Sequence, residues 1–177
     1  MSRRGAALTR MPGDPLIELL AEAVQPRPRR QGWHGGPTPV GAVRGLTAAD
    51  AAWRPPGSAH SIWELTLHIA YWNYAVRRRI TGDDSARFPR SPSNWPEPPA
   101  RPTDAAWDAD RALLLDAHTR LTDAIRTVPP SRLGERPAGA KKWTYGELIT
   151  GIAQHDAYHT GQIQLLKRLR SGRRNRS

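Results

Sequence analysis

Two segments of the chain open with the same helix-start signal and continue at helical spacing. Ser61-Ile62-Trp63-Glu64 and Thr144-Tyr145-Gly146-Glu147 each place a hydroxyl residue three positions before a glutamate. In this capping box the hydroxyl and the carboxylate satisfy two free N–H groups at the start of a helix. Mostly apolar residues follow at steps of three and four, which places them on one face. Since no run alternates apolar and polar residues, the sequence predicts an all-α protein.

Two further helices are predicted, over Asp14–Val24 and from about Asp104 to Val128. Asp14 is a good N-cap and Pro15 suits the first helical position, whereas Pro129-Pro130 ends the later helix. We expect the first helix to bury a face made of Leu16, Leu19, Leu20 and Ala23. Core candidates in the later helix are Trp107, Leu114, Leu121 and Ile125.

Long connections separate these helices. Short helical pieces are expected at Pro39–Gly45 and Ala48–Trp53, and a Pro-rich connection runs from Thr81 to Pro102. We expect the second long helix to end near Gly82 and the last one near Gly172. Four helices with two long connections predict a four-helix bundle with crossovers, rather than a simple up-and-down order.

The net charge of +11 is concentrated at the two ends of the chain. Residues 1–30 hold six arginines against three acidic residues, and residues 167–177 hold six basic residues and no acidic one. Between them, residues 31–166 hold fifteen basic and thirteen acidic residues. We therefore expect a bundle domain over 14–170, between a disordered basic tail at 1–13 and a basic tail at 171–177. This distribution argues against specific nucleic-acid recognition, and leaves an accessory nucleic-acid role of the basic ends as an alternative.

The chain contains no cysteine, which excludes disulfides, thiolate metal sites and cysteine nucleophiles. No apolar run reaches the roughly 18 residues that a membrane helix needs. Residues 1–11 lack the apolar core of a secretory leader. We therefore expect a cytoplasmic protein that does not contact a membrane.

Two of the six histidines, His155 and His159, lie four residues apart on the last predicted helix, so they share one face. Imidazoles buried there need polar partners, and one divalent cation would satisfy both. Because bundle metal sites take ligands from facing helices, His68 is the best third candidate. Three histidines with an open position are typical of a catalytic metal site. Spacing alone leaves open that these are core histidines bonded to carbonyls or waters.

The segments around these histidines, taken together, resemble the motifs of one known family. The stretches 61–65 (Ser-Ile-Trp-Glu-Leu), 68–72 (His-Ile-Ala-Tyr-Trp) and 155–163 (His-Asp-Ala-Tyr-His-Thr-Gly-Gln-Ile) resemble the motifs of the DinB-like (damage-inducible, YfiT-type) superfamily. The stretches 33–37 and 45–48 are similar to the N-terminal part of that family. The paired histidine motifs carry the resemblance, and the loops do not.

The resemblance covers about Trp33–Leu169. It implies a four-helix bundle that holds a divalent metal through His68, His155 and His159. The metals it implies are zinc or nickel, with manganese and iron as alternatives. The family includes S-transferases and isomerases that use a low-molecular-weight thiol (bacillithiol, mycothiol or glutathione), which the metal activates as the thiolate.

We therefore expect a metal-dependent enzyme that activates a thiol, or water, for transfer to a small electrophilic substrate, and that forms a homodimer. Fold and metal site do not fix a reaction, so two alternatives stay open. One is a metal-dependent hydrolase. The other is a non-enzymatic metal-binding stress-response module, in which a fourth protein ligand such as His34 or Glu64 closes the coordination sphere.

Four residues near the trio are candidates to support the ligands or to line a pocket. These are Glu64, Asp156, Tyr158 and Gln162. Glu64 could orient His68 four residues later, although completing the capping box is the simpler interpretation. Asp156 could accept a hydrogen bond from a ligand histidine, but we expect it to face solvent. Tyr158 and Gln162 could line the pocket, with packing between helices as the alternative for Tyr158.

Two other groups could contact a substrate. Arg77-Arg78-Arg79 could bind an anionic thiol or acid, although adjacent arginines on a helix usually point to solvent. The tryptophans Trp63, Trp72, Trp95 and Trp143 are expected to be core or interface residues.

Overall fold

The structure is a computed structural model that describes residues 13–26, 36–57 and 60–174. The tail predicted at residues 1–13 lies outside these ranges except for residue 13. Residues 175–177 and His34 also lie outside them. The helices are α1 Pro15–Val24, α2 Pro39–Ala42, α3 Ala48–Ala52, α4 Ile62–Thr81, α5 Asp104–Arg126 and α6 Tyr145–Arg174, with a 3-10 turn at Pro130–Arg132. No strand occurs in the described ranges, so the all-α prediction is confirmed. None of the described helices is long and apolar enough to span a bilayer.

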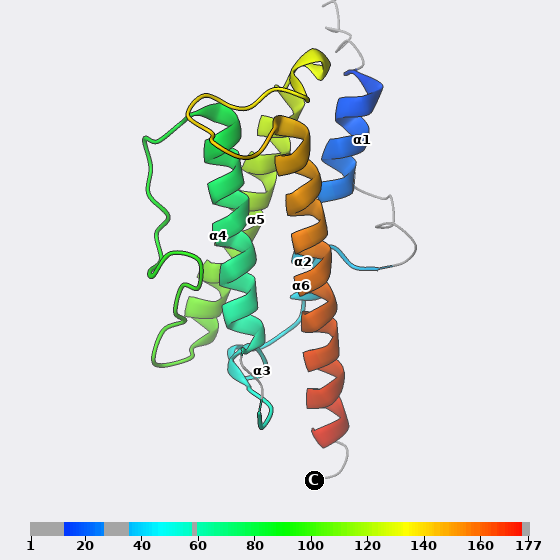
Figure 1. Ribbon diagram of the computed structural model, residues 1–177. Coiled ribbons are helices and arrows are strands. Elements are labelled where there is room, and N and C mark those ends of the chain that lie inside the picture. The colour runs from blue at the N-terminus through cyan, green and yellow to red at the C-terminus, as the bar shows by residue number, and fades with distance from the viewer. Residues whose placement is uncertain (1–12, 27–35, 58–59, 175–177) are drawn as a thin grey trace, which may run out of the picture.

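The four longest helices pack into a bundle (Figure 1). Helices α4 and α5 run in the same direction, because residues 82–103 return along the side of α4 before α5 begins (Figure 1). Helices α1 and α6 run the opposite way. The chain therefore has the crossover connection that its long Pro-rich segment predicted. The short helix α3 packs against α4 and α5 at the end of the bundle where α4 begins, whereas α2 packs against α6 and α5.

Both capping boxes form. The hydroxyl of Ser61 accepts from the Glu64 N–H at 3.3 Å while the Glu64 carboxylate accepts from the Ser61 N–H at 2.7 Å. Thr144 and Glu147 make the same pair of bonds at 3.2 and 2.8 Å. At the other end of α4, Gly82 adopts the left-handed conformation (φ 69°) that ends a helix with little strain.

Two details differ from the sequence prediction. Helix α1 buries Ile17, Ala21 and Val24, whereas Leu16 and Leu19 of the predicted face are exposed. The last helix does not end at Gly172 but continues to Arg174. A single glycine lowers the stability of a helix by only about 1 kcal/mol, so it does not by itself end a long one.

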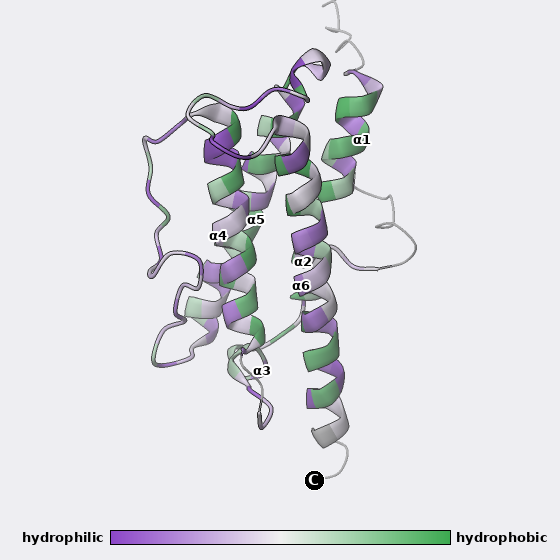
Figure 2. Ribbon diagram, in the orientation of Figure 1, coloured by the Kyte–Doolittle hydropathy of each residue, from purple (hydrophilic) through white to green (hydrophobic). Residues whose placement is uncertain are grey.

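The core consists of two apolar clusters with a polar layer between them. One cluster joins α2 and α3 to the first half of α4 and α5 and the second half of α6. The other joins α1 to the second half of α4 and α5 and the first half of α6. Seven buried polar residues of α4, α5 and α6 lie between the two clusters: His68, Asn73, His118, Thr122, Asp156, His159 and Thr160. Thr66 and Asp110 are also buried, in the parts of α4 and α5 that belong to the first cluster. Figure 2 shows the resulting mixture of purple and green turns along α4 and α6. Burying polar groups lowers the stability of the fold unless the groups are paired. A buried polar layer is therefore a candidate functional region.

Candidate metal centre

The three predicted ligands come together between α4 and α6. His68 lies in the middle of α4, and His155 and His159 lie one turn apart on α6. One nitrogen from each ring lies within 4.8 Å of the other two. One of these distances, from Nε2 of His68 to Nε2 of His155, is 3.0 Å. The one-turn spacing of His155 and His159 on α6, opposite His68 on α4, thus brings the three rings into one compact cluster.

The second nitrogen of each ring has an oxygen partner. Nδ1 of His68 donates to the backbone carbonyl of Asn94 at 2.5 Å, and Nδ1 of His159 donates to Oε1 of Gln162 at 2.7 Å. Nδ1 of His155 lies 3.3 Å from the carboxylate of Asp156. All three partners are acceptors, so each neutral ring carries its proton on Nδ1 and a lone pair on Nε2.

This arrangement fits a divalent metal ion. Two lone pairs 3.0 Å apart, on His68 and His155, repel unless a cation or a proton lies between them. Three nitrogens bound to one ion at tetrahedral angles, each about 2.1 Å from it, lie roughly 3.4 Å apart. A set of three imidazoles without thiolate suits zinc, nickel, copper or iron.

Burial favours the neutral rings that a metal requires. The pKa of His68 is lowered to about 4, mainly by burial and also by the nearby rings of His159 and His155, while the hydrogen bond to Asn94 opposes the shift. Burial also lowers the pKa of His159. Both rings are therefore neutral at neutral pH. Their Nε2 atoms carry no proton that an incoming cation would have to displace.

The Pro-rich connection between α4 and α5 forms one wall of the site. Asn94 adopts a left-handed conformation (φ 71°), which asparagine tolerates better than most residues, and its carbonyl meets His68. Its side-chain oxygen accepts from the indole N–H of Trp72 at 2.8 Å. Trp95 stacks on His68 on one face and on His60 on the other, each with 3.8 Å between ring centroids. This segment fixes the plane of the His68 ring and covers it from solvent.

Asp156 is buried rather than solvent-exposed, which corrects our expectation. Only 2% of the residue is accessible. Both of its carboxylate oxygens accept from the Asn73 amide, at 3.1 and 2.9 Å, and one of them also faces His155. The Asn73 amide also donates to the carbonyl of Ile69, so the network ties α6 to α4 directly behind the cluster.

The other candidate residues near the histidines do not belong to the cluster. Glu64 completes its capping box and pairs with Arg54 at 2.6 Å, and it does not join the cluster. Tyr158 is 65% exposed instead of packing between helices, and the edge of its ring lies against His159. His118 is a fully buried core histidine whose Nε2 donates to the carbonyl of Val24 at 3.1 Å.

Two contributors were missed at the sequence level, Asn73 and the backbone carbonyl of Asn94. Asn73 lies in the middle of an apolar helix face, and an asparagine at such a position is a usable signal of a buried network. A backbone carbonyl leaves no trace in the sequence. Trp95 is predicted from the sequence to be a core or interface residue, but the sequence does not predict its stacking on two histidines.

The fold and the cluster together define a class: an all-α bundle in which three histidines from two facing helices form a group that can hold a metal ion. Within that class, the chain belongs to the DinB superfamily, whose family model matches residues 40–163. The match runs from α2 into α6 and contains all three histidines. A search among proteins with curated descriptions finds no match.

Proposed function

We propose that the protein binds one divalent cation, zinc or nickel, through Nε2 of His68, His155 and His159. The observation that carries the proposal is the orientation of the three rings. Each Nδ1 faces an oxygen acceptor of this chain, which leaves the Nε2 lone pair of each ring for a cation, and one nitrogen of each ring lies within 4.8 Å of the other two. Iron also accepts imidazole ligands, whereas manganese is less suited, since it favours carboxylate and carbonyl oxygens.

We further propose that the protein is a metal-dependent enzyme acting on a small electrophile with the help of a thiol. A bound divalent cation lowers the pKa of a coordinated thiol or water, which supplies a nucleophile near neutral pH. Among the described residues, no carboxylate or further histidine joins the trio. Three protein ligands leave a position for an exogenous group, as in catalytic sites rather than closed structural ones.

The chain's own residues would exclude water and hold the ligands still. Trp95 covers the ring of His68, and the Asn73–Asp156 pair holds α6 against α4 behind the site. His155 is the most accessible of the three, with 24% of its side chain exposed, so an incoming molecule would approach from its side. The homodimer and the cytoplasmic location stay predictions of the sequence.

The proposed activity is tested with the zinc-loaded protein, glutathione, bacillithiol or mycothiol, and chlorodinitrobenzene as the electrophile. Thiol-dependent turnover is expected, and His155→Ala should lose both the metal and the turnover. His118→Gln, which changes a histidine outside the cluster, should retain both. Turnover at the wild-type rate in His155→Ala would refute the mechanism.

The same preparations separate the two alternatives. Hydrolysis of a nitrophenyl ester without any thiol would assign a hydrolase. A zinc-loaded protein with neither activity would favour the non-enzymatic module. In that case mutating His34, which the sequence offers as a fourth ligand, should weaken metal binding.

A further inference from the structure

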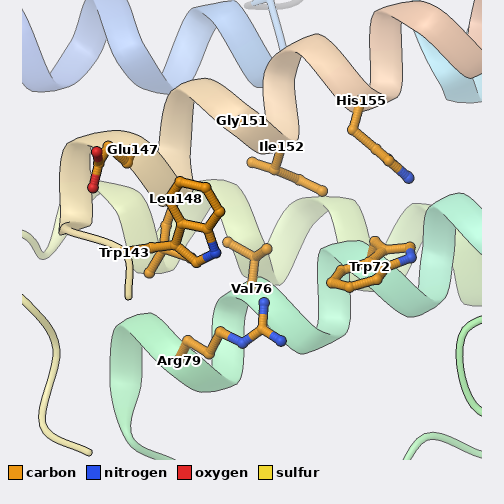
Figure 3. A pocket seen from close by; sticks show the side chains of 9 residues that line it. All are labelled: Trp72, Val76, Arg79, Trp143, Glu147, Leu148, Gly151, Ile152 and His155. Atoms are coloured by element: carbon orange, nitrogen blue, oxygen red, sulfur yellow. The ribbon is translucent and has the colours of Figure 1, made fainter. Parts of the chain in front are cut away.

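A groove opens between α4 and α6 directly beside His155 (Figure 3). It encloses about 230 Å³. The floor is apolar and formed by Val76, Leu148 and Ile152. Trp72 lies toward the end where His155 is found, and Trp143 lies toward the other end (Figure 3).

The size of the groove restricts the ligand. An apolar cavity of about 150 Å³ admits a benzene molecule, so 230 Å³ admits one ring with a short substituent. A peptide or a dinucleotide does not fit. Trp143 is 45% exposed, and a large aromatic side chain left open on a groove wall is available for stacking.

One arginine at this groove has no carboxylate partner among the described residues. Of the three consecutive arginines of α4, Arg77 pairs with Asp83 at 3.0 Å and Arg78 pairs with Asp84. Arg79, which lines the groove, pairs with no carboxylate of the described residues, and its guanidinium lies 5.5 Å from the ring centre of Trp72. An arginine fork matches a carboxylate with two parallel hydrogen bonds.

The surroundings of Arg79 reinforce this charge. A second hollow of about 600 Å³ adjoins the groove, shares Arg79 and Trp143 with it, and adds Lys141 and Lys142. The Lys142 ammonium lies 4.4 Å from the ring centre of Trp143. The one acidic residue of the groove, Glu147, has its carboxylate engaged by Thr144 and directed away from the Arg79 guanidinium in Figure 3.

We propose that this groove binds a small carboxylic acid with a single planar ring, aromatic or unsaturated. The ring lies over the apolar floor between Trp72 and Trp143, its carboxylate pairs with Arg79, and its other end faces His155. The assignment rests on the proposed function only in one respect, namely that the bound acid is the electrophilic substrate. Binding itself requires no metal.

Calorimetric titration of the metal-free protein tests the groove, with cinnamate as the probe. Cinnamate should bind at least tenfold more tightly than cinnamamide, which has the same ring without the charge, because a hydrogen bond to a charged group contributes more than a tenfold change in affinity. Cinnamate should also bind at least tenfold more tightly than hexanoate, which has the charge without the ring. No detectable binding of cinnamate, or equal binding of cinnamate and cinnamamide, would overturn the proposal.

Two matched pairs of variants locate the site. Gly151 lines the groove, and a Cβ added there meets no atom within 4 Å, so Gly151→Leu should fill the groove without disturbing α6. Gly172→Leu is its control, because Gly172 has equally free space near the far end of the same helix. Arg79→Gln should weaken cinnamate binding at least tenfold, whereas Arg168→Gln, at an exposed position of α6, should not. Wild-type affinity in Gly151→Leu would overturn the assignment.

A parallel zinc titration separates this inference from the proposed function. Gly151→Leu and Arg79→Gln should bind zinc like the wild type, because neither residue belongs to the cluster. Cinnamate binding by a protein that takes up no zinc would defeat the proposed function and leave the groove assignment intact. Zinc binding without cinnamate binding would do the reverse.

Discussion

Each histidine of the cluster is oriented by an oxygen from a different part of the chain. His68 uses a carbonyl from the α4–α5 connection, His155 uses the neighbouring Asp156, and His159 uses Gln162 on the same helix. Such partners fix the tautomer and the ring plane before a metal arrives, and removing one typically weakens metal binding by about tenfold or more.

Gln162→Leu is therefore expected to weaken zinc binding about tenfold, because Nδ1 of His159 loses its acceptor and the ring is free to rotate. The measurement is a competition titration against a chromophoric chelator. Gln154→Leu is the matched control, since Gln154 is an exposed glutamine of the same helix beside His155. Equal weakening in both variants would show that the effect comes from the helix and not from the hydrogen bond.

Three buried histidines make the metal-free protein sensitive to acid. Burial lowers the pKa of His118 and of His159 below the ordinary 6.5, and that of His68 to about 4. Below pH 6.5 the unfolded chain takes up protons that the folded chain does not, so the free energy of unfolding falls as the pH decreases. The slope is at most about 1.4 kcal/mol per pH unit for each group.

Urea unfolding at about pH 7.5 and about pH 5.5 measures this loss. The wild type should be less stable at the lower pH, and His118→Gln, which keeps a donor for the Val24 carbonyl, should show a smaller difference. An unfolding free energy that does not change with pH would contradict the assignment of neutral buried rings.

The residues of the site were predictable only in part. The three histidines follow from helical spacing and from family resemblance, because both helices have clear start signals. The burial of Asp156 was not predictable from its position, since it depends on Asn73 of the facing helix. The carbonyl of Asn94 lies 26 residues from His68 along the chain, and only the path of the connection brings them together.

At the scale of elements, one buried carboxylate helps to hold the connection over residues 82–103 against the bundle. Asp110 of α5 is fully buried and accepts from Arg90 of the connection at 2.7 Å and from the indole N–H of Trp63 at 2.8 Å. A short distance further along, the same connection supplies Asn94 and Trp95 to the surroundings of the histidine cluster. The path of this segment is thus part of the site.

Arg90→Ala should lower the free energy of unfolding by about 2 kcal/mol, because it leaves the buried charge of Asp110 with fewer partners. It should also weaken zinc binding, since the connection that orients His68 is released. Urea unfolding and zinc titration measure the two effects. Arg87→Ala, at an exposed arginine of the same connection, should change neither, and an equal loss in both variants would contradict the role given to Asp110.

Element boundaries were predicted well where a local signal exists and poorly where tertiary contacts decide. The starts of α4 and α6 follow from their capping boxes, and the end of α4 follows from Gly82. Helix α1 carries two apolar stripes, and its packing against α5 and α6 selects Ile17 and Ala21 rather than the stripe that contains Leu16. Sequence periodicity alone does not distinguish two such faces.

Considered as a whole molecule, the bundle places its polar layer between two apolar clusters, where α4 and α6 face each other. A cation held by His68 and the α6 histidines would cross-link these two helices and stabilise the folded chain. With free zinc at 100 times the dissociation constant, the gain is about 2.7 kcal/mol. The site and the stability of the fold would then be coupled through one ion.

The most direct test of this account is a zinc titration of the purified protein, with bound metal counted by elemental analysis. The wild type should bind one ion per chain, and His68→Ala, His155→Ala and His159→Ala should each lose it. His118→Gln should still bind one ion, because that histidine lies outside the cluster. Absence of stoichiometric zinc or nickel in the wild type, or full retention of the ion by the three alanine variants, would contradict the central claim.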